Sequence, residues 1–181
     1  DTLDYRQINQ NLGLNTVWQL PSASEKNKKN LMLNFITQAN RDKISSNSAL
    51  TNTSLAFSQT LEETGWGYQA GMSYSSSRIS SLTDKMLGPT LGLNKAFGDL
   101  STALTAMWSR SHSSGELAPG LAVDRIINVS NLGCRLAYTI NKVHSLQLNI
   151  RYMIRNEPGN DRLGTNFSEL SSTIGYNYKF N

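Results

Sequence analysis

Hydrophobic and polar residues alternate along most of this 181-residue chain. In the segment WGYQAGMSYS, the even positions from Trp66 to Tyr74 are aromatic or apolar, and the odd positions are glycine, glutamine or serine. The segment SLQLNIRYMIR repeats the pattern, with apolar or aromatic residues at the even positions from Leu146 to Ile154. Successive side chains of a strand point to opposite faces, so this period predicts strands with one apolar and one polar face.

The alternation predicts nine strands, and together they indicate an all-β fold. Each predicted strand reaches the length of about 9 to 11 residues that a tilted strand needs to cross a bilayer. Strands of globular proteins average only about 5 to 6 residues. We therefore expect an antiparallel transmembrane β-barrel, closed because lipid does not tolerate an open sheet edge. The predicted strands are residues 5–20, 30–41, 50–61, 66–77, 86–97, 100–111, 125–140, 144–156 and 168–180.

The predicted connections alternate between long and short. Residues 42–49, 78–85, 112–124 and 157–166 form the long ones, residues 62–65, 98–99 and 141–143 the short ones, and residues 21–29 depart from the rhythm. Outer-membrane barrels have short periplasmic turns, which predicts a periplasmic C terminus in the bacterial outer membrane. Such barrels usually have an even strand count, so we expect residues 1–181 to be a barrel that lacks one or more N-terminal strands or domains.

Composition narrows the class further. Only 38% of the residues are hydrophobic, and no stretch approaches the roughly 20 apolar residues of a spanning helix, which excludes a helical membrane protein. The single cysteine, Cys134, has no partner for an internal disulfide, and it shares parity with Leu132 and Leu136, which predicts a lipid-facing side chain. The net charge of +4 does not indicate nucleic acid, because the only run of basic residues is at residues 26–29.

Aromatic residues fall near the ends of the predicted strands. Trp and Tyr combine an apolar body with a polar tip, which suits the level of the lipid headgroups. Aromatic residues also favour strands in general, which is the plainer explanation. The predicted interfacial aromatics are Trp18, Trp66, Tyr68, Tyr74, Phe97, Trp108, Tyr138 and Tyr152.

Acidic residues avoid the strand middles, whereas several basic residues take the parity of the polar face. Arg135, Arg151, Arg155 and Lys179 are therefore expected to face the lumen. A hairpin through residues 141–143 would place Arg135 diagonal to Arg151. These residues predict either an anion-preferring lumen or a docking strip for an acidic plug, and the alternative is a wall whose charges water screens.

The last residues, TIGYNYKFN, resemble the C-terminal β-signal of Gram-negative outer-membrane β-barrel proteins, with Tyr176, Tyr178 and Phe180 at its alternating positions. The pattern departs by one residue, since Phe180 is followed by Asn181. The resemblance implies that the chain is the C-terminal part of such a barrel. It also implies outer-membrane lipid and the barrel-assembly machinery as partners, with a plug segment or partner subunits as further candidates.

The sequence offers no catalytic set. His112 and His144 are expected at opposite ends of the barrel, and no metal-ligand spacing or cofactor motif occurs, so we expect neither an enzyme nor a cofactor. The favoured function is an integral outer-membrane anchor or scaffold in a surface or export assembly. The alternatives are a pore or transporter with a basic, anion-tolerant lumen, and a soluble β-sandwich binding domain. An outer-membrane hydrolase is least favoured.

Overall fold

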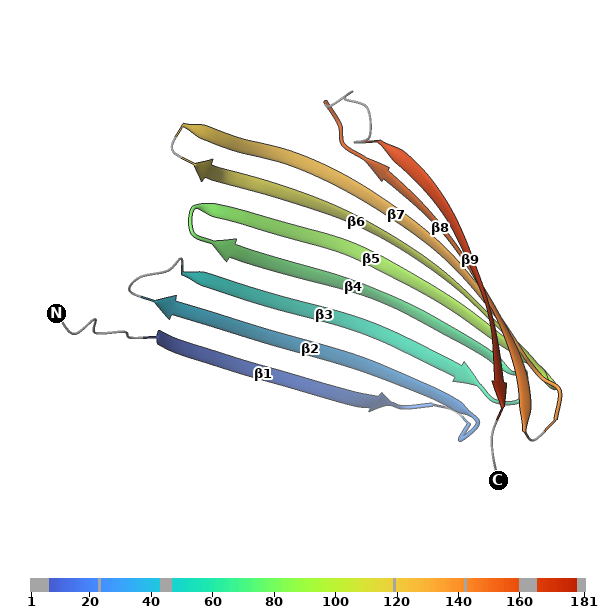
Figure 1. Ribbon diagram of the computed structural model, residues 1–181. Coiled ribbons are helices and arrows are strands. Elements are labelled where there is room, and N and C mark those ends of the chain that lie inside the picture. Colours follow the sequence, from blue (N-terminus) through green and yellow to red (C-terminus); the bar gives the residue numbers. More distant parts are fainter. Residues whose placement is uncertain are drawn as a thin grey trace.

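The computed structural model describes residues 7–22, 24–42, 47–118, 120–141, 143–159 and 166–178. These residues form one antiparallel sheet in which each strand pairs with the next along the chain, in the order β1 to β9 (Figure 1). The nine strands are β1 (Gln7–Leu20), β2 (Asn27–Asp42), β3 (Ser48–Leu61), β4 (Trp66–Ile79), β5 (Leu82–Phe97), β6 (Leu100–Ala118), β7 (Leu121–Thr139), β8 (His144–Asn156) and β9 (Phe167–Tyr178).

The all-β class, the nine strands and their antiparallel order are confirmed. The expected starts and ends agree within a few residues for most strands. The first residues of the predicted strand 5–20 and the last of 168–180, including Lys179 and Phe180, lie outside the described residues.

Two predicted long connections are wrong. Residues 78–85 contain the end of β4 and the start of β5, which leaves only Ser80 and Ser81 as a turn. Residues 112–124 belong almost entirely to β6 and β7. In these extensions the apolar side chains Ile79, Leu82, Leu121 and Val123 lie on the polar face, whereas the charged side chains Arg78, Lys85 and Asp124 lie on the apolar face. The alternation of each strand is therefore not continued there, although the residues still form cross-strand pairs, with a register shift between Glu116 and Ala118. The long and short rhythm that suggested the orientation of the chain therefore holds only in part.

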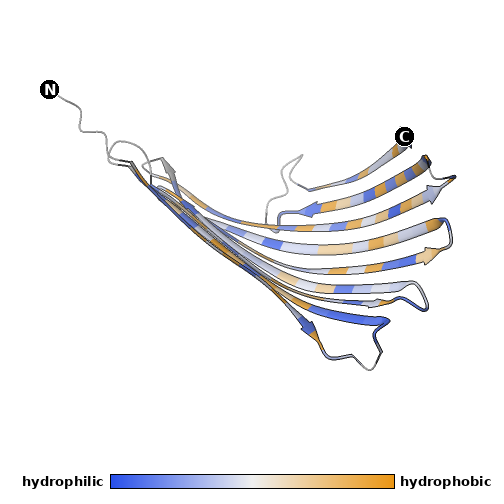
Figure 2. Cartoon of the chain, turned by 90° about the horizontal axis from the view of Figure 1, so that it is seen from below, coloured by the Kyte–Doolittle hydropathy of each residue, from blue (hydrophilic) through white to orange (hydrophobic). Residues whose placement is uncertain are grey.

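The pairing register keeps most of the large apolar side chains on one side of the sheet, although Val17, Ile36 and Met107 are among those on the other side. Leu33 of β2 lies opposite Leu55 of β3, which in turn lies opposite Met72 of β4. Further along, Leu104 of β6 lies opposite Cys134 of β7, and Cys134 opposite Ile150 of β8. We name this side the apolar face and the other the polar face. The apolar face carries the even positions of β1, β4, β6, β7, β8 and β9 and the odd positions of β2, β3 and β5. Figure 2 shows the resulting alternation of hydropathy along the strands.

The described sheet is curved but open, so the predicted closure into a barrel is not found (Figures 1 and 2). Strands β1 and β9 are its two edges and do not pair with each other. In an up-and-down sheet of nine strands the first and last strands run in the same direction. An antiparallel ladder between these edges is therefore impossible, because such a ladder needs strands of opposite direction.

No hydrophobic side chain is buried among the described residues. Leu12 is 62% exposed, Leu104 51% and Ile174 79%, all on the apolar face. In β4 the apolar-face residues Met72 and Tyr74 are exposed, while polar-face residues beside them are half-buried. The described part of the chain thus provides no cover for its apolar face, and it contains no helix long and apolar enough to span a membrane.

Candidate functional site

The apolar face carries a continuous stretch without charged side chains, which we name the uncharged band. It is narrowest in β5, where Lys85 and Lys95 bracket Leu87, Pro89, Leu91 and Leu93. Ten residues of strand span about 34 Å, which becomes about 25 Å for a strand tilted by about 40°. The band comprises the apolar-face positions within residues 8–20, 31–39, 49–61, 66–76, 87–93, 100–108, 126–138, 146–156 and 168–178.

Basic side chains border the uncharged band at both ends. Arg78, Lys85 and Arg110 lie on the apolar face at the end of the β4–β5 turn. At the opposite end, the Lys95 ammonium lies 4.9 Å from the ring centroid of Trp66 and 5.3 Å from that of Phe97, and it also contacts the Thr64 carbonyl. Long basic side chains can lay their stems along apolar surface while the charge reaches water.

All eight predicted interfacial aromatics lie on the apolar face, as the register of their strands requires. Trp66 and Tyr68 stack, with ring centroids 6.1 Å apart. No larger aromatic cluster forms among the described residues, so the side chains Trp18, Tyr74, Phe97, Trp108, Tyr138 and Tyr152 share a face but do not form a ring of contacts. Their placement at a lipid interface stays a prediction.

The predicted assembly signal lies in β9, of which Tyr176 and Tyr178 are described. Both belong to the apolar face, where Tyr176 pairs with Leu146 and Tyr178 with His144. The His144 ring lies beside both tyrosines, and its Nδ1 contacts the Tyr176 hydroxyl. The third member, Phe180, lies outside the described residues. Nothing in this arrangement tests recognition by an assembly machinery.

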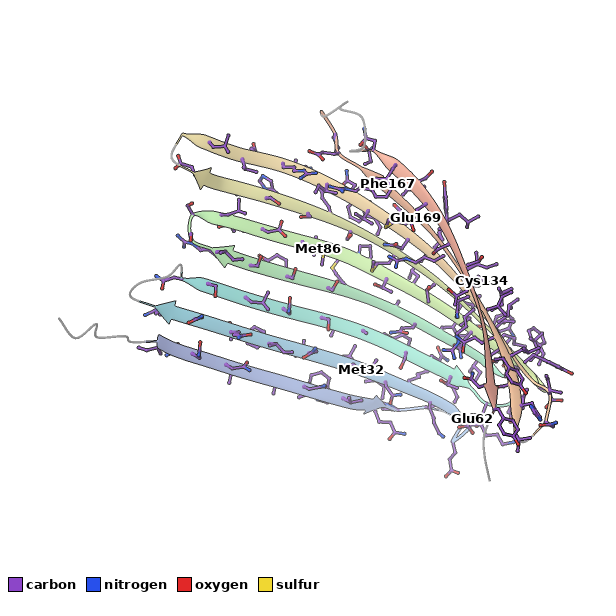
Figure 3. All side chains as sticks on the ribbon, viewed as in Figure 1. Met32, Glu62, Met86, Cys134, Phe167 and Glu169 are labelled. Atoms are coloured by element: carbon purple, nitrogen blue, oxygen red, sulfur yellow. The ribbon has the colours of Figure 1, made fainter. Side chains whose placement is uncertain are left out.

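The predicted arginine pair is present on the polar face (the same sheet is drawn with its side chains in Figure 3). Arg135 lies opposite Asn149, and Arg151 opposite Gly133, so the two arginines are diagonal neighbours. The Arg135 guanidinium donates to the Gln147 side-chain carbonyl at 3.0 Å. Arg151 donates through Nε and Nη2 to Asn131 Oδ1, at 3.1 and 2.8 Å. Side-chain amides thus orient the two guanidinium groups.

One carboxylate lies near the arginine pair, because Glu169 of β9 is diagonal to Arg151 on the polar face and lines a small hollow with it. No carboxylate forms an ion pair with Arg135 or Arg151 among the described residues, and both side chains are exposed. Both contribute to a shallow pocket of about 410 Å³. Arg155, four residues beyond Arg151 in β8, lies over the Phe167 ring at 5.9 Å. The arrangement can attract an anion, and no bond-breaking chemistry follows from it.

Sequence reasoning missed three polar contacts at the ends of the strands near the β4–β5 turn. Asp84 Oδ1 accepts hydrogen bonds from the hydroxyl groups of Ser111 and Ser113, each at 2.8 Å. Arg125 pairs with the nearly buried Glu157 at 2.6 Å. The signal for the first was available, because a hairpin through Gly98 and Asp99 pairs position 84 with position 113.

A third missed contact joins His112 Nε2 to Asp124 Oδ1 at 2.7 Å. His112 is a residue of β6, and not of a loop as predicted. It lies at the end of the sheet opposite to His144, so the two histidines are separated as expected. Within the described ranges, no three His, Cys, Asp or Glu side chains gather in a way that could hold a metal ion. Cys134 is half-buried on the apolar face, in a depression of about 440 Å³ that Leu91 and Ile150 also line.

The structure therefore brings together a two-faced sheet, an uncharged band with basic borders, and an arginine pair on the polar face. No protein-family model matches the sequence, and a comparison with curated proteins finds no match. By its fold, the described part of the chain is an all-β antiparallel meander sheet of nine strands.

Proposed function

We propose that this chain is the wall of an integral outer-membrane β-barrel whose role is to anchor or scaffold a larger assembly. The observation that carries the proposal is the uncharged band on an exposed apolar face. Contiguous exposed apolar patches larger than a few hundred Å² are rare on soluble monomers and mark membrane or protein contacts. The band's estimated height of about 25 Å equals that of the apolar belt of outer-membrane barrels.

Energetics support lipid contact over water contact. Burial of one Leu or Ile side chain contributes about 1.5 to 3 kcal/mol, and the apolar face exposes Leu12, Leu91, Leu132 and Ile174 by more than half. A charged residue at mid-depth would cost about 2 to 4 kcal/mol in lipid, and none occurs within the band. Contact with lipid acyl chains would therefore bury these side chains away from water, which stabilises a sheet whose apolar face has no protein cover among the described residues.

The proposed barrel closes with strands that are not among β1 to β9. Parallel-running edges at β1 and β9 require an odd number of additional antiparallel strands, contributed by the same polypeptide or by other subunits. In the proposed orientation the C-terminal end of β9 is periplasmic, in keeping with its resemblance to the β-signal. The lipid of the outer membrane and the barrel-assembly machinery are its proposed partners.

A pore function is the second candidate, and the arginine pair favours it. Arg135 and Arg151 lie on the polar face, which would line the lumen, without a carboxylate partner among the described residues. An open lumen with these charges would pass anions more readily than cations. The anchor is preferred, because Glu169 lies diagonal to both Arg151 and Arg155 on the polar face, and its negative charge opposes an anion preference there.

The test uses a matched pair of neighbouring positions in β3. Leu55 is on the apolar face opposite Leu33 and Met72, and Ser54 is on the polar face opposite Asn34 and Ser73. In phospholipid vesicles, we expect Leu55→Arg to lower the free energy of unfolding by about 2 to 4 kcal/mol, because the charged side chain enters the hydrocarbon layer. Ser54→Arg is expected to change it by less than about 1 kcal/mol, because its charge stays in water. Equal losses in urea titrations of the two variants would contradict the assignment of the faces.

A further inference from the structure

Three basic side chains cluster on the apolar face beside one border of the uncharged band. Arg78 of β4, Lys85 of β5 and Arg110 of β6 are all exposed, and we name them the basic rim. Arg78 pairs with Thr83 and Lys85 with Ser76, so these two cations are diagonal neighbours. Lys85 is likewise diagonal to Arg110. Diagonal neighbours lie about 7 to 8 Å apart, so the rim concentrates three positive charges across adjacent strands.

No carboxylate neutralises the basic rim within the described part of the chain. None of its members forms an ion pair there. Asp84 points to the polar face, where Ser111 and Ser113 bind it, and Asp124 binds His112. Glu116 lies six residues beyond Arg110 in β6, a distance of about 20 Å along a strand. The rim therefore has unsatisfied capacity for an anion from outside the sheet.

The opposite end of the sheet differs. Lys26 pairs with Glu63 at 3.3 Å, and Lys28 with Glu62 at 2.5 Å. Lys95 lies over the rings of Trp66 and Phe97. Lys28 belongs to the polar face, whereas Lys29 belongs to the apolar face and has no ion pair or ring contact among the described residues. Most cations at this end are thus already paired, whereas the three cations of the basic rim have no ion pair among the described residues.

We infer that the basic rim binds the phosphate groups of anionic lipid in one leaflet of the membrane. The inference rests on the proposed function, since the uncharged band places the rim at headgroup depth. Arginine binds phosphate through parallel N–H donors, and lysine binds it as a point charge. A lipid fits better than free phosphate, because Leu87 lies directly opposite Arg110, and Trp108 follows on the same face toward the band. One molecule could thus place its phosphate on the rim and its acyl chains on the band.

The test compares binding to two kinds of vesicle. The folded chain is transferred from detergent to vesicles of phosphatidylcholine alone, or of phosphatidylcholine with one part in five of phosphatidylglycerol, and its partition is measured by flotation. We expect a preference for the anionic vesicles that the triple variant Arg78→Gln, Lys85→Gln, Arg110→Gln loses by about a hundredfold, at about fivefold for each side chain. Circular dichroism confirms that the variant retains its β structure.

A matched control removes the same number of charges from the other end. Lys26→Gln, Lys28→Gln, Lys29→Gln is expected to keep most of the preference, because two of these cations already have carboxylate partners. Equal losses in both triple variants, or a wild-type chain that binds the two vesicles equally, would overturn the phosphate site. Failure to enter even the neutral vesicles would instead overturn the proposed membrane function, so the two outcomes are distinguishable.

Discussion

At the scale of single residues, the two faces of the sheet differ in crowding as well as in polarity. Gly88 lies on the polar face of β5 and is buried, and a Cβ atom there would lie 2.5 Å from the Trp108 carbonyl oxygen. At Gly133, also on the polar face, a Cβ atom would lie 2.5 Å from the Thr105 hydroxyl oxygen. Small side chains on this face therefore permit the close approach of neighbouring strands.

We predict that Gly88→Ala reduces the free energy of unfolding by about 1 to 3 kcal/mol, because the backbone of β6 must shift to admit the methyl group. Gly13→Ala is the control, since nothing lies within 4 Å of a Cβ atom at that position of β1. That change should be neutral or stabilise by up to about 1 kcal/mol, through the unfolded chain. Urea unfolding of both variants provides the comparison, and equal midpoints would contradict the close approach at Gly88.

The sequence predicted the face of each residue better than its partners. Parity alone assigned Arg135, Arg151 and Cys134 to their faces, because a strand has a strict period of two. The side-chain amides of Gln147 and Asn131 that orient the arginines were not predicted, because rotamers of long polar side chains are not determined by register. Phe180 and Lys179 stay predictions, as they lie outside the described residues.

At the scale of elements, the strands continue beyond the uncharged band and are joined by tight turns. Between β4 and β5, Ser80 has φ of 55°, the only non-glycine residue with positive φ in the described part of the chain. The adjacent Ser81 hydroxyl donates to the Glu116 carbonyl at 2.6 Å, which connects this turn to β6. The backbone of Ser80 is therefore strained at the turn where the β4–β5 hairpin contacts β6.

Ser80→Gly should relieve the backbone strain at this turn and raise the free energy of unfolding by about 0.5 to 1 kcal/mol. Glycine adopts positive φ without a Cβ clash. Ser80→Ala serves as the control, since it removes the hydroxyl group but keeps the Cβ atom. The midpoints of thermal or urea unfolding measure both. A glycine variant no more stable than the alanine variant would show that the turn carries no such strain.

The pattern of hydrophobic and polar residues predicted the middle of each strand but not all of the strand ends. Alternation identified the strands wherever one face is consistently apolar, and it failed at residues 78–85 and 112–124, where apolar side chains such as Ile79 and Leu121 lie on the otherwise polar face. There the strands are held by pairs such as His112 with Asp124 and Asp84 with two serines, which depend on register between distant residues. Serine-rich composition alone resembles a loop.

At the scale of the whole molecule, nine strands form an open sheet whose apolar face has no cover among the described residues. Closure could not be derived from these strands alone, because it depends on what pairs with the edges β1 and β9. Lipid contact on the apolar face and water on the polar face form the central claim. A β-sandwich would instead bury the apolar face against a second sheet.

The most direct measurement is a nitroxide scan of β4 from Trp66 to Ser76, one cysteine at a time in a Cys134→Ala background, with the protein in phospholipid vesicles. The proposal predicts that collisions with oxygen, which concentrates in lipid, peak at the even positions such as Ala70 and Met72. Collisions with a water-soluble nickel complex should peak at odd positions such as Gln69 and Ser73, which lie on the polar face. Even positions shielded from both reagents would contradict lipid contact and indicate that protein covers the apolar face.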